Sequence, residues 1–412
     1  MNEQLVVKNF GPIKDATVDF KRVTVFIGPT GGGKSTLAKL KDIFCYDRNY
    51  AVGDVDNHPR FDYFDAYKDH ALNNYFSQNT YFTYQSATAN VSYKEGKHLV
   101  LTKSFGSPVT TPERIKSIYD RLIVAKNLQS EGKDFTILQA ELLNELSEIL
   151  NELELIESGE SARENFPILI APVAPWYCTS ERVFIPALEY SWAGLLRDDI
   201  GLPKLLLHFA NSFSLSRKEV PELDIPFLNV QYQHINGRDF IKIPEREEPL
   251  MLLETASGIQ SVTPLLVLLE HLSRNTEQAQ SFIIEEPELN LYPTAQQGLL
   301  NWLVEKCTKG ENDLTITTHS PYILSHLNLL LYAHQVAEQH PERRAEVAAI
   351  VPEASWINPK EFACYQVENG GVQSLVDDGL GLIDNNELDA LSGDAADAFD
   401  NLIRLSKAIA AK

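Results

Sequence analysis

The hydrophobic residues near the N-terminus fall in short segments that are typical of β-strands. These segments are LVVKNF, the stretch around ATVDF, and the apolar run VTVFIG. The apolar positions of KSTLAKLKDIFCY have the spacing of a helix, and a glycine-rich loop separates it from the last strand. The sequence therefore predicts three strands, a glycine loop and a helix, followed by a β-hairpin in NVSYKEG and HLVLTKSF.

A different pattern begins at Pro112 and continues to about Glu160. Apolar residues recur there at spacings of three and four, with a break at Gly132, and the second helix carries glutamates from Glu141 to Glu157 without a basic residue among them. This pattern predicts a helical hairpin with an acidic face, inserted between two α/β segments. The sequence leaves open whether the hairpin projects as an arm or packs as two ordinary helices.

The second α/β segment begins with a hairpin and continues as alternating strands and helices. In FLNVQYQHINGRDFIKI, Asn236-Gly237 lies between alternating apolar residues, which is a strong signal for a tight hairpin turn. Strands are then predicted in SFIIEEPELN and DLTITTH, and helices in TAQQGLLNWLVEKC and SPYILSHLNLLLYAHQV. This alternation predicts a parallel sheet. From about Val347 we expect two or three more strands and a final helix, ALSGDAADAFDNLIRLSKAIA.

The whole chain is predicted to be an α/β protein with a mixed, mainly parallel sheet, an antiparallel β lobe and a small C-terminal α/β extension. Its 412 residues, of which 44% are hydrophobic and 23% charged, suit a globular chain with a large core. The changes of pattern divide it into an N-terminal lobe, a helical insertion, a second lobe and a C-terminal extension, at residues 1–111, 112–165, 166–330 and 331–412.

The charge of the chain disfavours stable binding to nucleic acid. The formal net charge is -21, and no run of adjacent Lys or Arg residues exceeds two. A protein that holds DNA by its phosphates needs several Lys or Arg side chains at the interface. Acid is concentrated between Val376 and Asp400, where eight Asp or Glu occur without Lys or Arg. We interpret that stretch as a solvated face in preference to a docking surface for a basic partner.

The sequence also predicts a cytoplasmic protein. The N-terminus, MNEQ, has no basic stretch followed by an apolar core, and prolines interrupt the uncharged run from Asn165 to Ser180. We therefore expect neither a signal peptide nor a membrane span. The four cysteines are far apart and none forms a CxxC pair, which predicts reduced thiols.

The glycine loop carries the first candidate chemistry. Gly28-x4-Gly33-Lys34-Ser35 fits a phosphate-binding loop, in which glycines let backbone N–H groups approach the phosphates and the lysine reaches the terminal ones. The Ser35 hydroxyl is predicted to bind Mg²⁺, and ATP is favoured over GTP because no NKxD-type guanine signature occurs. The residues predicted here to contact the nucleotide are Gly28, Gly31, Gly32, Gly33, Lys34, Ser35 and Thr36.

A pair of acids follows the strand predicted in FIIEEPE. Glu285 and Glu286 stand where the carboxyl end of this strand would meet the phosphates. Neighbouring residues on a strand point to opposite sides, so we expect Glu285 to hold the water shell of Mg²⁺ and Glu286 to act as general base on the attacking water. Together with Lys34, these acids predict an ATPase.

Two further stretches resemble the ABC ATPases. ASGIQ, residues 256–260, is similar to their LSGGQ signature, and His319, after the strand LTITT, is similar to their switch histidine. The resemblance implies that His319 contacts the γ-phosphate, and that the signature covers the γ-phosphate of nucleotide bound to another subunit. Two copies at least would then share each site, with ATP joining them. The signature residues are Ser257, Gly258 and Gln260.

The opening VKNFGPIKDATVDF, EEPELNLYP and TTHSPYIL resemble the group that includes SMC-like repair ATPases, overcoming-lysogenisation-defect proteins and stand-alone AAA-type ATPases of bacterial anti-phage systems. The resemblance covers Met1 to about Thr110 and Thr179 to Leu327. IFCYD, SERVFIPA and SGIQSVTPLL are most similar to the ATPase subunits of the PARIS defence system. That resemblance implies a homo-oligomeric scaffold, hexameric in that system, which holds a toprim-type nuclease and releases it when a viral protein is sensed.

Several residues depart from the ABC pattern. Tyr292 stands where many ABC proteins have the aspartate of the loop after the acidic pair, and Gln78 and Gln85 both remain candidates for the Q-loop glutamine. LVDDGLGLIDNNELD does not supply the acid set of a toprim nuclease. We therefore favour a sensor or scaffold ATPase over a DNA-repair ATPase and over a transporter subunit. Arg182 could approach the site or an interface, and an ordinary salt bridge is the favoured expectation.

Overall fold

The computed structural model describes residues 3–45, 63–86, 89–94, 97–102, 175–188, 201–274, 279–377, 379–384 and 398–404. The helical hairpin predicted for residues 112–165 lies outside these ranges, as does most of the predicted final helix. The division of the chain into four parts stays a prediction.

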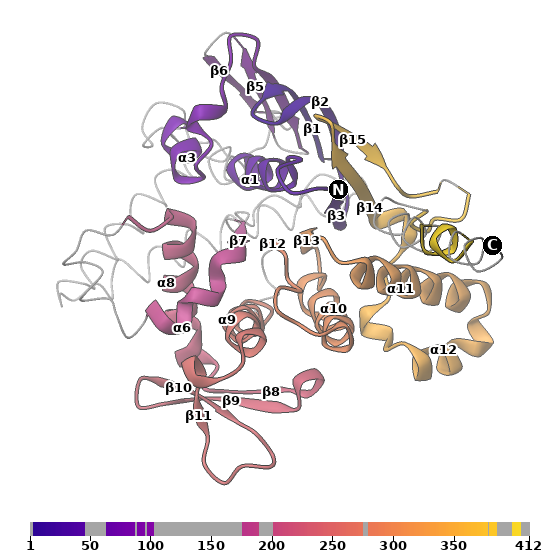
Figure 1. Cartoon of the computed structure of the whole chain (residues 1–412). Coiled ribbons are helices and arrows are strands. Elements are labelled where there is room, and N and C mark those ends of the chain that lie inside the picture. Colours follow the sequence, from indigo (N-terminus) through magenta and orange to yellow (C-terminus); the bar gives the residue numbers. More distant parts are fainter. Residues whose placement is uncertain are drawn as a thin grey trace, which may run out of the picture.

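A six-stranded sheet in the order β15-β14-β3-β13-β12-β7 forms the centre of the fold (Figure 1). All its neighbouring strands are parallel except the β14–β15 hairpin. The predicted α/β class with a mixed sheet is therefore confirmed, and the predicted C-terminal extension contributes β14 directly beside β3. The strands are β3 (Val23–Ile27), β7 (Trp176–Cys178), β12 (Ser281–Glu285), β13 (Asp313–Thr317), β14 (Phe362–Glu368) and β15 (Gly371–Ser374).

The three middle strands β3, β13 and β12 are buried at every position, as expected for a parallel sheet covered on both faces. Alternate residues of β3 reach two different cores. Val23, Val25 and Ile27 belong to one core, whereas Phe26 belongs to the other. The continuous apolar run VTVFI therefore serves two layers at once.

The first face of the central sheet is covered by helix α1 (Lys34–Cys45) and by an antiparallel sheet in the order β2-β1-β4-β5-β6 (Figure 1). The β5–β6 hairpin was predicted, whereas β4 was not. The strands are β1 (Glu3–Phe10), β2 (Ile13–Phe20), β4 (Tyr81–Gln85), β5 (Ala89–Lys94) and β6 (Lys97–Thr102), and α3 (Tyr63–Asp69) with the 3₁₀ turn η1 (Asn73–Tyr75) precedes β4.

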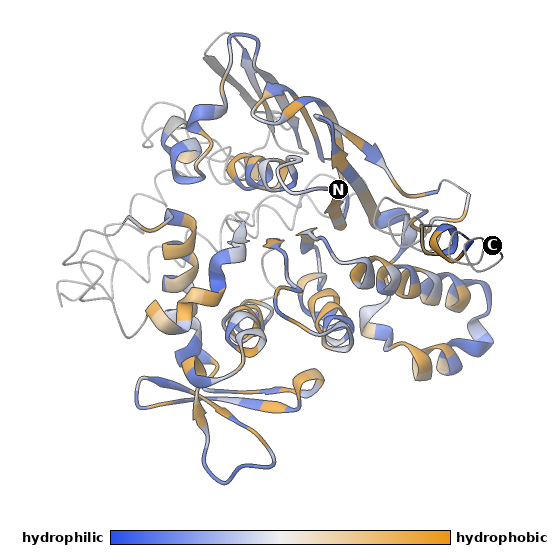
Figure 2. Ribbon diagram, in the orientation of Figure 1, coloured by the Kyte–Doolittle hydropathy of each residue, from blue (hydrophilic) through white to orange (hydrophobic). Residues whose placement is uncertain are grey.

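On the opposite side, four long helices contribute buried apolar residues to one core, and Figure 2 shows both hydrophobic and hydrophilic residues along them. They are α8 (Lys204–Glu219), α9 (Ser257–Leu272), α10 (Pro293–Cys307) and α11 (Pro321–Gln339). The short elements on this side are η2 (Ser180–Phe184), α6 (Ile185–Leu188), η5 (Pro341–Arg343), α12 (Arg344–Ile350), η6 (Glu353–Ser355) and η7 (Pro359–Glu361).

A third sheet, in the order β11-β10-β9-β8, is antiparallel throughout. Asn236 and Gly237 join β9 to β10 with φ angles of 52° and 76°, the positive values that a tight hairpin turn requires. The predicted hairpin is therefore confirmed. The strands are β8 (Glu222–Ile225), β9 (Val230–Ile235), β10 (Arg238–Lys242) and β11 (Leu250–Met251), with η3 (Pro226–Leu228) and η4 (Leu252–Glu254) beside them.

All four cysteines are buried and free, as the sequence predicted. Burial raises the pKa of the Cys45 and Cys178 thiols to about 12, so these side chains stay protonated and unreactive at neutral pH. Among the described helices, none combines the length and the apolar character that crossing a membrane requires.

Candidate nucleotide-binding site

The glycine loop connects the end of β3 to the start of α1, and its backbone lies directly against β14. Gly28 and Gly33 have φ angles of 136° and 113°, which residues with a Cβ rarely adopt. A Cβ on Gly28 would lie 2.3 Å from the carbonyl oxygen of Val367, and one on Gly32 would lie 2.5 Å from the same oxygen. The close approach of these two backbones therefore requires glycine. Gly31, with φ 79°, lies on the open side of the loop, where a Cβ would meet nothing within 4 Å.

The first turn of α1 presents three polar side chains in different environments. The Lys34 ammonium donates hydrogen bonds to the carbonyl oxygens of Gly28, at 2.9 Å, and Pro29, at 3.0 Å, so it lies inside the loop. Ser35 is exposed, whereas Thr36 is buried. The Ser35 hydroxyl is thus accessible to a metal ion, and Thr36 could contact an anion only through its backbone N–H at the helix N-terminus.

The chain turns between the two acids at the end of β12. The strand ends at Glu285, and Glu286 has a left-handed φ of 42° with its N–H donating to the Thr317 carbonyl at 2.8 Å. Glu285 is 5% exposed, while the side chain of Glu286 is 33% exposed. The sequence interpretation placed both acids on the strand. The strand is one residue shorter, and it is the turn at Glu286 that gives the two carboxylates different surroundings.

Lys34 and the acids form one electrostatic group. Burial lowers the pKa of Lys34, while the nearby carboxylates of Glu286, Glu285 and Glu288 act to raise it. The structure therefore brings the predicted lysine and both predicted acids together at the carboxyl end of the central strands.

His319, which follows β13, joins the same group. Its Nε2 atom lies 3.6 Å from Oε1 of Glu286. Burial is the main cause that lowers the pKa of His319, the charge of Lys34 lowers it further, and Glu286 opposes both. A neutral imidazole at neutral pH can accept or donate one hydrogen bond next to the glycine loop.

Glu288 is a member of this site to which the sequence interpretation assigned no role. It is 8% exposed, and one carboxylate oxygen accepts hydrogen bonds from the Thr318 hydroxyl at 2.6 Å and from the His319 N–H at 3.0 Å. Burial raises its pKa. Glu288 therefore connects the acidic loop to the histidine loop. In the sequence it is one more acid of EEPE, and nothing there reveals that it is buried.

The residues present fit a magnesium ion. Oε1 of Glu285 is buried and has no hydrogen-bond partner among the described residues, and the exposed Ser35 is the second residue of the helix after the loop. No group of three or more His, Cys, Asp or Glu in the described parts of the chain is arranged to hold a metal. A nucleotide-bound Mg²⁺ does not need one, because phosphate and water supply most of its ligands.

The stretch that resembles a signature lies at the N-terminus of α9. Ser257 is exposed, whereas Gly258 packs so tightly that a Cβ would lie 2.6 Å from the Asn290 carbonyl oxygen. The Gln260 amide donates to the carbonyls of Leu253, at 2.9 Å, and Thr255, at 2.6 Å. Gln260 therefore closes the turn before its own helix. Among the described contacts, none joins this stretch to the glycine loop of the same chain.

The salt bridge expected for Arg182 is wrong for the described residues, where no carboxylate lies within ion-pair distance of it. Its side chain is fully buried. The guanidinium instead donates to backbone carbonyls, those of Thr179 at 3.1 Å, Glu285 at 2.6 Å and Glu286 at 2.5 Å. Arg182 therefore approaches the site, which was the alternative expectation, but its partners were not predicted because a backbone carbonyl carries no residue-specific signal.

Comparison with known proteins gives a family for the chain. No curated protein matches it. The SMC head domain from Thermotoga maritima aligns with 12% identity and a TM-score of 0.33, over 91% of this chain and 98% of that one. The recombination mediator protein RecF aligns with 13% identity and a TM-score of 0.32, over the same shares. At these TM-scores neither alignment carries a functional argument.

A family model described as "AAA ATPase domain" matches residues 1–175 and 202–324, which is more than half of the sequence, and the chain therefore belongs to that ATPase family.

Proposed function

We propose that this protein hydrolyses ATP at the glycine loop, with Glu286 as the general base. The observation that carries the proposal is the convergence of Lys34, Glu286 and His319, which lie within electrostatic reach of one another. These side chains come from three separate segments: Lys34 from the start of α1, Glu286 from the loop after β12 and His319 from the loop after β13. They meet at the carboxyl ends of the parallel strands, where nucleotides bind in α/β proteins.

Each side chain has a distinct task in this proposal. Lys34 neutralises the terminal phosphates, and its charge is already balanced by neighbouring carboxylates. The partly exposed Glu286 takes the proton of the attacking water. His319, neutral at pH 7, hydrogen-bonds the γ-phosphate. Ser35 and Glu285 would hold Mg²⁺, which supplies neutralisation of phosphate charge when it is bound.

The test is the substitution Glu286→Gln, which removes the base and preserves the shape of the side chain. This variant should bind ATP with unchanged affinity and hydrolyse it about 10²- to 10⁴-fold more slowly, the usual loss for a general base. The matched control is Glu311→Gln, the same change at an exposed acid between α10 and β13, which should leave turnover unchanged. If Glu286→Gln turned over ATP at the control rate, the assignment of the base would be wrong.

We further propose that bound ATP joins copies of the chain, and that the assembly is a sensor or scaffold that holds a separate effector protein. By its resemblance to anti-phage ATPases, the effector would be a toprim-type nuclease released on sensing a viral protein. Support comes from Ser257 and Tyr292, the latter 76% exposed, which leave the start of α9 and the loop after the acids open to a second copy. The net charge of -21 also suits a protein partner better than DNA.

The assembly is tested by the native mass of Glu286→Gln with Mg-ATP, with and without duplex DNA at physiological salt. A discrete oligomer that needs ATP and ignores DNA supports the scaffold. Assembly that needs DNA would instead favour an ATPase of DNA repair or maintenance. Mixing Lys34→Ala with Ser257→Arg subunits asks whether copies share sites, because only a shared site can be rebuilt from two inactive subunits.

A further inference from the structure

Arg182 lies at the back of the acidic pair. It belongs to η2, which directly follows β7, and β7 pairs with β12 in the central sheet. Its Nη1 atom donates to the carbonyls of Thr179 and Glu285, and its Nη2 atom donates to the carbonyl of Glu286. One guanidinium therefore holds two consecutive carbonyls at the point where β12 ends and the two acids diverge.

The backbone at this point needs such a hold. Glu286 has a φ of 42°, a conformation that is unfavourable for a residue with a Cβ and persists only where the surroundings enforce it. The peptide group between Glu285 and Glu286 is bonded at both ends, since its carbonyl accepts from Arg182 and its N–H donates to Thr317. This clamp determines the direction in which the Glu286 side chain leaves the backbone.

Arginine suits this position for a geometric reason. Its planar fork places two nitrogen donors in fixed directions toward the two carbonyls, whereas the three donors of a lysine ammonium sit on one nitrogen and rotate freely. The Arg182 side chain is fully buried, and among the described residues no carboxylate lies within ion-pair distance of it. A buried cation without such a partner is costly to keep. A residue that served only to fill space here would be apolar.

We propose that Arg182 is a positioning residue for ATP hydrolysis, which directs the Glu286 carboxylate toward the water and His319. The proposal rests on the function proposed above. Arg182 does not contact the nucleotide in this scheme, because its Nη1 and Nη2 atoms donate to the carbonyls behind the acids and its Nε atom is buried. It acts on the rate of the chemical step and not on nucleotide affinity, which depends on the glycine loop and Lys34.

The experiment compares Arg182→Lys, which keeps the charge and loses the fork, with Arg182→Gln, which keeps planar donors and loses the charge. The matched control is Arg217→Lys, since Arg217 is 14% exposed and bonds Asp239 of β10, away from the acids. For each variant we would measure kcat, KM, the Kd of ATP and the thermal midpoint. Both Arg182 variants should lower kcat about ten- to a hundredfold, the effect of misplacing a catalytic group by about 1 Å, with the Kd of ATP within about threefold of wild type. The control Arg217→Lys should change neither kcat nor the Kd of ATP.

A purely structural arginine gives a different result. Its substitution would lower the thermal midpoint and leave kcat unchanged at temperatures where the variant is folded, and that outcome overturns the proposal. A loss of ATP affinity that matches the loss of kcat would overturn it as well. If both variants fail to fold, the test is the NMR spectrum of wild type labelled with ¹⁵N-arginine. The Nη signals of Arg182 should shift on adding Mg-ATP, and unchanged signals refute the proposal. Failure of the proposed function is recognised separately, by a wild type that does not hydrolyse ATP or a Glu286→Gln that does.

Discussion

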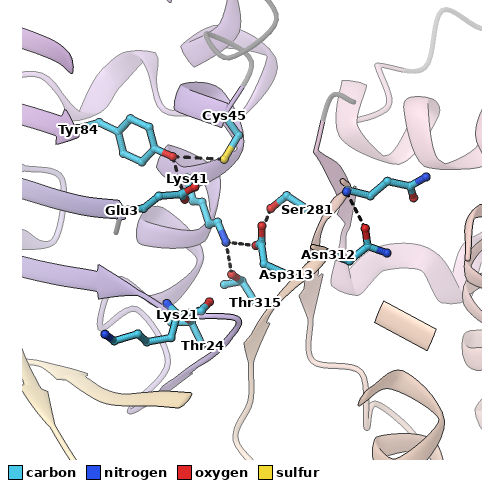
Figure 3. Close-up of polar contacts among 11 residues, drawn as sticks. Glu3, Lys21, Thr24, Lys41, Cys45, Tyr84, Ser281, Asn312, Asp313 and Thr315 are labelled. Carbon is cyan, nitrogen blue, oxygen red and sulfur yellow. Dashed lines mark hydrogen bonds and ion pairs between the residues drawn. The ribbon is translucent and has the colours of Figure 1, made fainter. Parts of the chain in front are cut away.

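The helix that follows the glycine loop is held to the central sheet by a buried ion pair, whose loss should be costly. Lys41 of α1 contacts Asp313 of β13, and both side chains are buried, at 0% and 2% exposure (Figure 3). Lys41 also donates to the Thr315 hydroxyl at 2.9 Å, and the Ser281 hydroxyl donates to Asp313 at 2.8 Å. Figure 3 shows these groups converging between α1 and the strands β12 and β13.

The substitution Lys41→Met keeps most of the aliphatic stem and removes the ammonium, which lies 4.8 Å from the centroid of the Phe20 ring. It leaves the Asp313 carboxylate buried with Ser281 as its described donor. Removing one partner of a buried pair costs about 3–5 kcal/mol, a large part of the roughly 5–15 kcal/mol that stabilises a typical domain. The double variant Lys41→Met/Asp313→Asn removes the unpaired charge as well. We expect it to recover at least about half of that loss.

The assay is equilibrium unfolding in urea, followed by circular dichroism, for both variants. Lys8→Met is the control, because Lys8 and Asp15 form an exposed pair, with side chains 46% and 64% exposed, and such a pair contributes less than about 1 kcal/mol. The reasoning is refuted if Lys41→Met costs no more than Lys8→Met, or if the double variant is as unstable as the single one.

Three further predictions concern the glycine loop and its neighbours. Lys34→Ala should abolish ATP binding in a fluorescent-nucleotide titration, because the phosphates lose their counter-charge; near-normal affinity would contradict the loop's role. Gly28→Ala should weaken ATP binding at least about tenfold, since its Cβ would meet a backbone oxygen at 2.3 Å, whereas Gly201→Ala, where a Cβ meets nothing, should bind normally. Because burial lowers the pKa of His319 from 6.5, kcat should stay level down to pH 6.5 and fall only below it; an acid limb above pH 6.5 that disappears in His319→Gln would show the opposite shift.

Local patterns predicted much of the fold. The apolar run VTVFI, the turn at Asn236-Gly237 and the strand–loop–helix around Lys34 were all recognisable, because each depends on neighbours in the chain. The pairing of β14 with β3 was not predicted, since it joins segments more than 300 residues apart and no local pattern reports such a partner.

The sequence likewise predicted which residues form the candidate site but not the tertiary contacts that shape it. The acids, the lysine and the histidine could be named from their order, but the left-handed turn at Glu286 and the burial of Glu288 arise from tertiary contacts. Arg182 shows the limit most clearly. Its partners are backbone carbonyls that any sequence would offer, so only the fold reveals which ones it holds.

The most direct test of the central claim is to incubate Glu286→Gln and wild type with Mg-ATP and to identify the nucleotide that each protein retains. The account predicts that Glu286→Gln retains ATP, while wild type retains ADP after turnover. The account is contradicted if the variant retains ADP formed at the wild-type rate, or if neither protein binds nucleotide.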